Sequence, residues 1–517
     1  MRVGVDIGGT NTDAAVILGN EVLGSYKFPT QDDFVESVKS AIAEALNNAQ
    51  AAPADVSAVM LGTTQFTNAF TERKRLQRAA ILRICLPFNR DIEPMLDWPA
   101  DLKDVLGSNT YMVRGGYEFD GREAAALDET AIRNAARDMR RKELRHIAVS
   151  CIFSTINDAM EKRAGAIIAR EIPDALITLS SRVGRLGLID RENAALINAS
   201  LGDLGAALVE SFAGALRMLG IDAPFYVSQN DGSLMAPEYA ARNPVLTYSS
   251  GAANSIRGAA YLTRCDNAIA IDIGGTTTDV GVLKNGFPRE RSRPRPFGGV
   301  RTNFRMPDLI SIGLGGGSIV RLGKDLRVGP ESVGGALERE ALIYGGDVLT
   351  ATDIAVAAGR VKLGDPSRLA GIPAGEAVRA DQVIQAMIAE AVDKMKTTAM
   401  DMPVIVVGGG RFLASHDLAG AARLHIPGHA GVANAIGAAI ALISGQAEQI
   451  VDYNRADGAE AIAAVKKKAR EEAVAAGADP ATLRVVDVEE LPVPYTEGKL
   501  MSVRVKVVGD PLMEGAG

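Results

Sequence analysis

One eight-residue motif occurs twice in the chain, and this repeat constrains the fold more than any other feature of the sequence. The first copy reads D-I-G-G-T-N-T-D from Asp6 to Asp13, the second reads D-I-G-G-T-T-T-D from Asp272 to Asp279, and seven of the eight positions are identical. Apolar, largely β-branched residues precede each first aspartate, and a second apolar run follows each motif. This pattern predicts two hairpins, each made of a strand, a glycine turn and a second strand.

Each predicted turn has the residues of an anion-binding site. Glycine has no Cβ, so the backbone can come close to a ligand, and successive N–H groups form a concavity for anions, with threonine hydroxyls as further donors. The aspartate that ends each first strand would face a bound phosphate, which is tolerable when a divalent cation neutralises the charges. A single copy fits an ordinary tight hairpin equally well, but two copies far apart favour ATP held between two lobes with magnesium.

A third glycine run lies in the second half of the chain. The segment P-V-I-V-V-G-G-G-R, from Pro403 to Arg411, predicts a buried strand that ends in three glycines, on which a flat ring could lie. Residues 412–422 are mostly helix-forming. Residues 431–443 predict a helix of small residues that either packs against another helix at a hinge or is an ordinary core helix.

Composition and charge exclude several classes of protein. The chain has 56 Lys and Arg against 63 Asp and Glu, a net charge of −7, and no long basic run, so we expect no nucleic-acid partner. We also expect no membrane span, because no stretch approaches the roughly 18 apolar residues that one requires. Cys85, Cys151 and Cys265 lie far apart, which argues against a disulfide framework or a thiolate metal site and favours the reducing cytoplasm. Arg2 is followed at once by a strand-like run rather than by the apolar core of a signal peptide.

The last part of the chain predicts a small α+β module. An Ala-, Lys- and Glu-rich helix is expected up to Gly477, followed by a turn at Asp479 to Leu483 and two strands. Met501 to Val508 is interpreted as an edge strand, which needs cover. The charged helix face could be simply solvated, or the module could dock onto a partner protein.

The order of two phosphate loops, a third glycine loop and a small-residue helix resembles the actin, Hsp70 and sugar-kinase ATPase superfamily. Within it, four stretches resemble the hydantoinase A and 5-oxoprolinase family. They are G-T-T-Q-F-T-N-A-F-T-E-R-K (62–74), L-D-E-T-A-I with I-A-V-S-C-I-F-S (127–132 and 147–154), I-G-L-G-G-G-S-I with L-R-V-G-P-E-S (312–319 and 326–332), and T-A-T-D (350–353).

The chain also departs from the family pattern at three places. L-E-R-E-A-L-I-Y-G, from Leu337 to Gly345, replaces a P-G-P-A-C-Y-G-like stretch. Ile310 occupies a position where the family often has histidine, and S-G-A-A-N-S, from Ser250 to Ser255, replaces S-G-P-A-A-G. These departures leave the identity of the substrate open.

The resemblance implies an α/β, two-lobed actin-like (ribonuclease H-like) ATPase fold. The expected parts are a first lobe at 1–180, which is the N-terminal hydantoinase/oxoprolinase domain, a second lobe at 181–450, which is the hydantoinase A-type ATPase domain, and the small module at 451–517.

The resemblance further implies the ATP-binding subunit of a cyclic amide hydrolase, acting on a lactam, hydantoin or 5-oxoproline-type ring. Such an enzyme transfers the γ-phosphoryl group to the substrate carbonyl oxygen before water attacks. It also implies a second protein subunit in a hetero-oligomer, with a homo-oligomer as the alternative. The competing functions are the ATP-using subunit of a ketone carboxylase and a non-enzymatic actin-like ATPase that remodels a partner protein.

In this scheme the site residues come from the three glycine loops and one polar loop. Asp6 and Asp272 bind magnesium largely through water, and Asp13 and Asp279 are further catalytic candidates. A polar loop of the first lobe could face the substrate, or its threonines and asparagine could cap the backbone; its candidates are Thr63, Thr64, Asn68 and Arg73. The residues predicted to bind the nucleotide are Gly8, Gly9, Thr10, Asn11, Gly274, Gly275, Thr276, Thr277, Gly408, Gly409 and Gly410.

Overall fold

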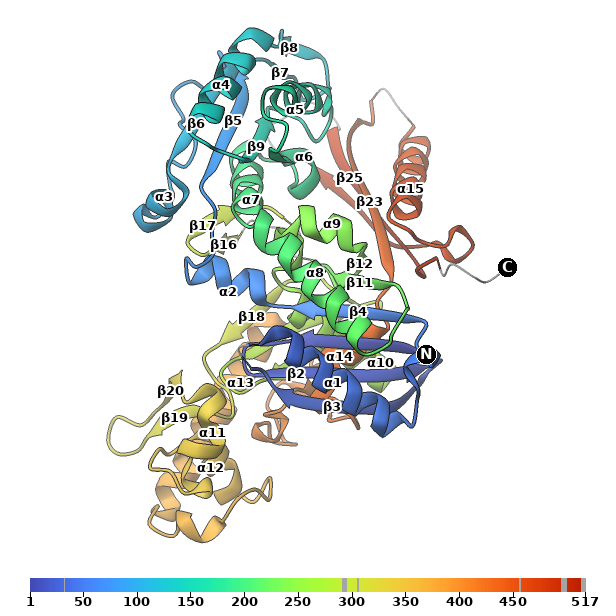
Figure 1. Cartoon of the computed structure of the whole chain (residues 1–517). Helices are drawn as coiled ribbons and strands as arrows, with labels where there is room; N and C mark the ends of the chain where they lie inside the picture. Colours follow the sequence, from blue (N-terminus) through green and yellow to red (C-terminus); the bar gives the residue numbers. More distant parts are fainter. Residues whose placement is uncertain (32, 291–294, 305, 455–456, 494–499, 513–517) are drawn as a thin grey trace.

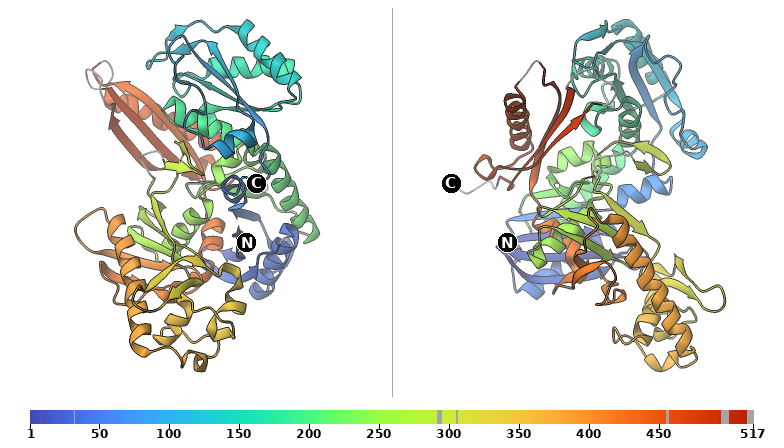
Figure 2. Two further views of the ribbon diagram at one scale, coloured as in Figure 1. Left: turned by 90° about the vertical axis from the view of Figure 1, so that its left-hand side faces the viewer. Right: turned by 180° about the vertical axis from the view of Figure 1, so that it is seen from behind.

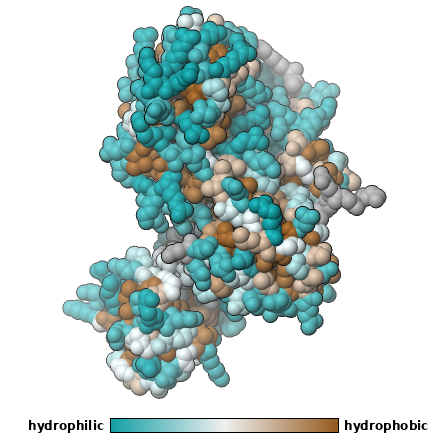
Figure 3. Space-filling model, in the orientation of Figure 1, coloured by the Kyte–Doolittle hydropathy of each residue, from teal (hydrophilic) through white to brown (hydrophobic). Residues whose placement is uncertain are grey.

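A computed structural model describes residues 1–31, 33–290, 295–304, 306–454, 457–493 and 500–512. Three large sheets organise the chain (Figure 1). The first contains the blue N-terminal strands and the red C-terminal hairpin, the second lies in the yellow and orange lobe, and the third forms the cyan unit at the top of the view. Hydrophilic residues cover most of the face seen in Figure 3, with apolar residues in separate patches.

The first sheet has nine strands and draws them from both ends of the chain. Strand β1 pairs in parallel with β4 and antiparallel with β2, and β11 extends the parallel part next to β4. The order is β24 (Arg484–Pro492), β25 (Leu500–Gly509), β23 (Ile443–Asp452), β12 (Leu234–Met235), β11 (Phe225–Ser228), β4 (Ala58–Thr63), β1 (Arg2–Ile7), β2 (Asn11–Leu18) and β3 (Glu21–Pro29). Helices α1 (Phe34–Ala49) and α8 (Gly202–Met218) share its core.

The second sheet repeats the strand arrangement of the first around the second motif. Strand β13 pairs antiparallel with β14 and parallel with β21, just as β1 pairs with β2 and β4. The order is β15 (Phe287–Pro288), β14 (Thr278–Lys284), β13 (Ala268–Ile273), β21 (Met402–Val407) and β22 (Ala421–His425), with β18 (Leu309–Ile312) also on β14. The long helix α13 (Ala374–Met395) packs in its core with α12 (Ala351–Ala357).

The third sheet is a parallel one that the sequence interpretation did not separate from the first lobe. Its order is β10 (Leu176–Leu179), β9 (His146–Cys151), β5 (Ala79–Leu86) and β6 (Asn109–Arg114). Helices α4 (Glu129–Arg141) and α5 (Ala159–Glu171) share a core with it. The expected division of the chain at residues 180 and 450 remains a proposal; the first sheet contains strands from both sides of each position.

Both predicted hairpins are confirmed, with the same register. Asp6 lies opposite Asp13 across β1 and β2, and Asp272 lies opposite Asp279 across β13 and β14. The buried strand predicted before the third glycine run is β21.

Two helices cross where the first two sheets meet. Helix α14 (Ala433–Ala439) shares a core with β2, and α10 (Ser250–Thr263) shares one with β13 and β21. A Cβ on Gly258 of α10 would lie 1.9 Å from the backbone oxygen of Ala433, and a Cβ on Gly437 of α14 would lie 1.8 Å from that of Asn254. The predicted small-residue helix therefore packs closely against another helix, because only glycine lets the two backbones approach this far.

Two local expectations are wrong. Residues 412–422 do not form a helix: a short 3-10 turn, Arg411–Leu413, leads into a loop and then β22. Strand β25 is not an edge strand, because β23 pairs along its other side; the edge strand is β24. Helix α15 (Gly458–Ala475) packs on this hairpin, and the hairpin lies beside the cyan unit in the left view of Figure 2.

In the part of the chain that the structure describes, no helix is both long and apolar enough to span a membrane.

The remaining α-helices and strands are short, except for α7, a buried helix of 13 residues. They are α2 (Gln65–Thr71), α3 (Ala100–Leu106), β7 (Gly116–Tyr117), β8 (Glu123–Ala125), α6 (Ser180–Val183), α7 (Leu188–Ser200), α9 (Pro237–Arg242), β16 (Arg295–Phe297), β17 (Val300–Thr302), β19 (Ser318–Arg321), β20 (Arg327–Ser332) and α11 (Leu337–Glu340).

Candidate functional site

The two glycine turns have the same local geometry. The Gly8 N–H donates to the Asn11 carbonyl at 2.9 Å, and the Gly274 N–H donates to the Thr277 carbonyl at 2.9 Å. A Cβ added at Gly9 or at Gly275 would have no atom within 4 Å. Each turn therefore presents backbone beside open space, as a phosphate-binding turn requires.

The turns of the two lobes meet at one short segment, the 3-10 turn Gly334–Ala336. A Cβ on Gly334 would lie 3.7 Å from Oγ1 of Thr276, and a Cβ on Gly335 would lie 3.6 Å from Cγ2 of Thr10. Motifs that are far apart in the sequence are thus adjacent in space, so one ligand could contact both turns.

Asp6 is buried in a concentration of negative charge. Its side chain is 3% exposed, and Nδ2 of Asn434 donates to its Oδ2 at 2.9 Å. Burial, together with the nearby charges of Asp13 and Asp272, raises the pKa of Asp6 to about 7. Its Oδ1 atom is buried and has no hydrogen-bond partner among the described residues.

Asp272 occupies the equivalent position in the second lobe. The hydroxyl of Ser255 donates to its Oδ2. Burial raises the pKa of Asp272, while the Ser255 hydroxyl and the positive charge of Lys27 act in the opposite direction. The structure therefore brings together Asp6, Asp13 and Asp272, three of the four predicted catalytic carboxylates.

The second aspartate of each motif has a different partner. Asp13 forms an ion pair with Lys27 of β3, with Nζ at 2.5 Å from Oδ1. Asp279 accepts a hydrogen bond from the Ser311 hydroxyl of β18. Both partners lie on the neighbouring strand, directly across from the aspartate.

Each first aspartate also packs against a glycine at the end of the adjacent parallel strand: the penultimate residue of β4 or the residue just after β21. A Cβ on Gly62 would lie 2.2 Å from Oδ1 of Asp6 and 2.7 Å from Nδ2 of Asn254, and a Cβ on Gly408 would lie 2.3 Å from Oδ1 of Asp272. A Cβ added at Gly408 would thus meet the second carboxylate first, and the predicted role of Gly408 in binding the nucleotide stays a prediction.

The second turn is braced by two further glycine segments. The Gly316 and Gly317 N–H groups donate to the Gly274 and Gly275 carbonyls at 3.0 and 2.7 Å, and the Gly410 N–H donates to the Ile273 carbonyl at 2.7 Å. The first turn is braced by two threonines. The Thr30 hydroxyl donates to the Gly8 carbonyl at 3.0 Å and its N–H to the Thr10 carbonyl at 2.9 Å, and the Thr64 N–H donates to the Ile7 carbonyl at 3.2 Å.

The four substrate candidates do not form one loop. Thr63 ends β4 and accepts a hydrogen bond from the Gln65 N–H at 3.2 Å, and the Thr64 hydroxyl donates to the Ile7 carbonyl at 3.3 Å. Asn68 lies exposed on α2. Arg73 donates to Asp101 at 2.8 Å and to the Gly298 carbonyl at 2.9 Å. These contacts match the backbone-capping alternative for both threonines, and a substrate role for the four remains a prediction.

Thr64 is the candidate that lies beside the carboxylates. A Cβ on Gly251, near the start of α10, would lie 3.6 Å from Cγ2 of Thr64 and 3.7 Å from Oδ2 of Asp6.

Sequence reasoning missed Lys27, Asn254, Ser255 and Asn434, which contact or lie beside the motif aspartates. Asn254 and Ser255 are in the S-G-A-A-N-S stretch that was singled out only as a departure from the family pattern. For Asn434 the only signal was a polar residue within an otherwise small-residue or apolar helix, and for Lys27 the sequence contained no signal.

The residues present fit a divalent cation held mainly through water. Among the described residues, no group of three His, Cys, Asp or Glu side chains could enclose a metal ion directly. The unpartnered Asp6 Oδ1 and the crowded carboxylates nevertheless make a hydrated cation electrostatically favourable.

Comparisons with known proteins cover most of the chain. A family model described as "Hydantoinase/oxoprolinase N-terminal region" matches residues 2–172, and one described as "Hydantoinase/oxoprolinase" matches residues 191–403. The chain is 26% identical over 381 residues to the caprolactamase subunit alpha of Pseudomonas jessenii, covering 69% of this chain and 54% of that protein. It is 28% identical over 266 residues to the acetophenone carboxylase gamma subunit of Aromatoleum aromaticum, covering 48% and 35%. The matches thus span about half, or less, of the length of these relatives.

Two solved structures share the fold. The ATP-dependent caprolactamase from Pseudomonas jessenii superposes with a TM-score of 0.77 at 20% identity, covering 98% of this chain and 87% of that one. Nucleotide-free acetone carboxylase superposes with a TM-score of 0.68 at 17% identity, covering 99% and 88%. The predicted two-lobed, actin-like α/β fold is confirmed.

Proposed function

The chain belongs to the hydantoinase/oxoprolinase family, and from this membership we propose that it is the ATP-binding subunit of a hydrolase that opens cyclic amides of the lactam, hydantoin or 5-oxoproline type. The observation that carries the proposal is the meeting of the two D-I-G-G-T turns, one from each lobe, at Gly334 and Gly335. A relative whose solved structure is described as an ATP-dependent caprolactamase supports both the nucleotide and the substrate class.

In this proposal the two turns bind the phosphates of ATP. The backbone N–H groups around Gly9 and Gly275 and the hydroxyls of Thr10 and Thr276 donate to the phosphate oxygens. Asp6 and Asp272 would hold magnesium through its water ligands. When bound, magnesium would supply the positive charge that offsets the phosphates and the carboxylates. Gly408, Gly409 and Gly410 remain candidates for the nucleotide ring.

ATP would activate the amide carbonyl of this substrate class toward attack by water. Resonance makes an amide carbonyl a poor electrophile, whereas its oxygen can attack the γ-phosphorus of a correctly placed ATP, with ADP as the leaving group. The resulting imidate-like phosphate has an activated carbon that water can attack. Collapse of the adduct releases inorganic phosphate and breaks the ring C–N bond, whose nitrogen takes up a proton, so the products are the ring-opened amino acid, ADP and phosphate. The chain's part is to position the reactants and to stabilise charge, which are the main contributions of proteins to phosphoryl transfer.

A ketone carboxylase subunit is the second candidate. The acetophenone carboxylase gamma subunit and the acetone carboxylase beta subunit of Xanthobacter autotrophicus also match this chain, the latter at 22% identity over 367 residues. Both activities would use the same ATP site, because a ketone and an amide each present a carbonyl oxygen to the γ-phosphoryl group.

We also propose that a second polypeptide completes the enzyme. The caprolactamase and carboxylase relatives are named as alpha, beta and gamma subunits. The chain alone is expected to bind ATP and to open a ring only slowly.

One assay separates these possibilities. The chain is purified with the product of the neighbouring reading frame, and ADP release is measured with lactams, hydantoins and ketones, each with and without bicarbonate. Ring-opened product without bicarbonate supports the hydrolase, and turnover that requires a ketone and bicarbonate supports the carboxylase. Full ring opening by the chain alone would contradict the need for a partner.

A further inference from the structure

Helix α10 reaches the first aspartate of both glycine motifs through two consecutive residues. The Ser255 hydroxyl donates to Oδ2 of Asp272 in the second lobe. Asn254 lies beside Asp6 in the first lobe, because a Cβ on Gly62 would lie 2.2 Å from Oδ1 of Asp6 and 2.7 Å from Nδ2 of Asn254. Consecutive residues of a helix point about 100° apart, so one helix where the two sheets meet can contact both carboxylates.

The contact between Asn254 and Asp6 brings together buried groups that lack other partners. Asn254 is fully buried, and neither Nδ2 nor Oδ1 of its amide has a hydrogen-bond partner among the described residues. Oδ1 of Asp6 is likewise buried and unpaired within that part of the chain. Buried polar groups are rarely left unpaired, because the bonds to water that they lose on folding are then not replaced. The unpaired donor and the unpaired acceptor are neighbours here, and a hydrogen bond between them would satisfy both.

Neither polar side chain belongs to the pattern that the chain shares with its family. Asn254 and Ser255 are the last two residues of S-G-A-A-N-S, where the family pattern S-G-P-A-A-G has alanine and glycine. Alanine and glycine have no side-chain group that could bond to a carboxylate. These two residues are therefore not expected to take part in phosphoryl transfer itself, and their contacts point to the carboxylates.

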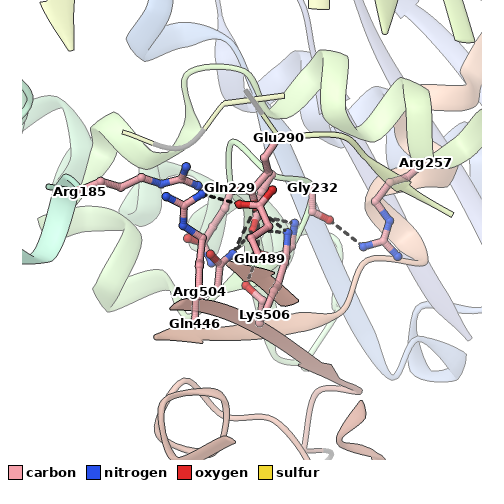
Figure 4. Close-up of polar contacts among 12 residues, drawn as sticks. Arg185, Gln229, Gly232, Arg257, Glu290, Gln446, Glu489, Arg504 and Lys506 are labelled. Carbon is pink, nitrogen blue, oxygen red and sulfur yellow. Dashed lines mark hydrogen bonds and ion pairs between the residues drawn. The ribbon is translucent and has the colours of Figure 1, made fainter. Parts of the chain in front are cut away.

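The next residues of α10 fix the helix against its surroundings. Arg257 is buried, and its Nη1 donates to the Gly232 carbonyl at 2.9 Å (Figure 4). Its guanidinium carbon lies 4.7 Å from the centre of the Phe287 ring. The turn that contains Gly232 is also held, because Nζ of Lys506 in β25 lies 2.7 Å from Oδ2 of Asp231. These contacts hold the helix in place next to the two residues that face the carboxylates.

We propose that Asn254 and Ser255 are positioning residues, which hold the first carboxylates of the two lobes in a fixed relation so that one hydrated cation can interact with both. The inference rests on the proposed function, because that function calls for magnesium at Asp6 and Asp272. Carboxylates that are already held in place need little reorganisation when a cation binds, which strengthens binding. Removing either side chain should therefore weaken the binding of nucleotide with magnesium.

Binding of AMP-PNP, an ATP analogue that is not hydrolysed, tests the proposal without relying on turnover. In calorimetric titrations of the full chain in excess magnesium, Asn254→Ala and Ser255→Ala should each raise the dissociation constant about tenfold. In steady-state ADP release from ATP, the magnesium concentration at half-maximal rate should rise by a similar factor, while kcat at saturating magnesium stays near the wild-type value. A variant that only lost folded protein would lower kcat and leave that magnesium concentration unchanged.

Two control variants remove buried or half-buried hydrogen bonds that involve no carboxylate. Asn198→Ala removes a buried amide of α7, whose Nδ2 donates to the Arg242 carbonyl at 2.8 Å. Thr263→Val removes a hydroxyl at the end of α10, which donates to the Ala259 carbonyl at 2.8 Å. Neither control should change the dissociation constant of AMP-PNP or the magnesium dependence, even where it lowers the melting temperature.

Double variants test whether each residue acts through its own carboxylate. Asn254→Ala should have no further effect on AMP-PNP binding in Asp6→Asn, but should keep its full effect in Asp272→Asn. Ser255→Ala should show the reverse dependence. A merely structural loss would add to both carboxylate variants alike, and such additivity would overturn the positioning role.

The same titrations distinguish a failure of this inference from a failure of the proposed function. If the folded wild type neither bound AMP-PNP with magnesium nor gained thermal stability from it, both would be wrong. If the wild type bound it normally and the dissociation constant and magnesium dependence were unchanged in Asn254→Ala and Ser255→Ala, the positioning role alone would be overturned and the proposed function would stand.

Discussion

The two D-I-G-G-T hairpins agree in sequence and turn geometry but differ in what surrounds their carboxylates. In the first lobe, Asp6 is almost fully buried, accepts an amide hydrogen bond from Asn434 and lies near Asp13, which is paired with Lys27. In the second lobe, Asp272 accepts a hydroxyl hydrogen bond from Ser255. The repeated motif thus specifies the backbone, while elements from elsewhere in the chain set the charge state.

The two lobes also differ in how their turns are supported. Glycine segments at 315–317 and 408–410 donate backbone hydrogen bonds to the second turn or pack on it, whereas Thr30 and Thr64 support the first with N–H and hydroxyl hydrogen bonds. Lys27 acts across the lobes, because its charge opposes the burial-driven rise in the pKa of Asp272 while it pairs with Asp13. The difference suggests a second turn fixed by backbone and a first turn tuned by side-chain charge.

The strongest test of the comparison removes each first carboxylate in turn. Asp6→Asn and Asp272→Asn should each lower ATP turnover by about a thousandfold while leaving the protein folded, because each removes charge that holds magnesium at the transferring phosphoryl group. Steady-state ADP release, with circular dichroism as the folding control, measures this. Near-normal turnover in either variant would show that ATP turnover depends on the first carboxylate of one lobe only.

The pH dependence of stability tests the charge crowding around Asp6. Its pKa of about 7 in the folded state lies above the ordinary value of 3.8, so the folded state binds this proton more tightly than the unfolded state. The resulting stabilisation is fully present below about pH 4 and is lost as the pH rises to about 7. Without metal, the free energy of unfolding should fall by about 3 to 4 kcal/mol more in the wild type than in Asp6→Asn over this window.

Urea unfolding at several pH values, in EDTA, measures that difference. Asp272→Asn should reduce the pH dependence in the same direction, because the pKa of Asp272 is also raised. Parallel stability curves for the wild type and Asp6→Asn would mean that neither burial nor the neighbouring carboxylates raise the pKa of Asp6.

Nucleotide binding tests whether both glycine turns contact the phosphates. Mg-ATP at 100 times its dissociation constant should add about 2.7 kcal/mol to stability. Gly9→Ala and Gly275→Ala place a methyl group in the open space of either turn without contacting other atoms, so both should fold normally and lose most of this gain. Thermal scans with and without Mg-ATP measure it. If Mg-ATP did not raise the melting temperature of the folded wild type, the nucleotide hypothesis would be wrong. If only one of the two variants lost the Mg-ATP stabilisation, the phosphates would bind to that lobe alone.

The sequence predicted those parts of the fold and site that depend on local pattern. Both hairpins and β21 follow from short apolar runs next to glycines, and the structure confirms them. Contacts between distant segments could not be predicted this way. Asn434 reaches Asp6 because α14, which follows the second sheet in the chain, packs on the first. The edge-strand prediction for Met501 to Val508 was wrong for the same reason, since the pairing of β23 with β25 joins distant residues, from Asp452 with Leu500 to Ile443 with Gly509.

The last prediction concerns the glycines against which the two carboxylates pack. Gly62→Ala should destabilise the fold by about 1–3 kcal/mol, because the new Cβ would lie 2.2 Å from Oδ1 of Asp6 and must displace a buried side chain. Gly408→Ala should cost about 1 kcal/mol more than that, since its φ of +92° strains any residue with a Cβ in addition to the 2.3 Å contact with Oδ1 of Asp272. Urea midpoints measure both, with Gly9→Ala as the control that adds a Cβ without a contact. If Gly62→Ala proved the more damaging, the first carboxylate would be the more rigidly fixed of the two, and the contrast between a backbone-fixed second turn and a charge-tuned first turn would have to be reversed.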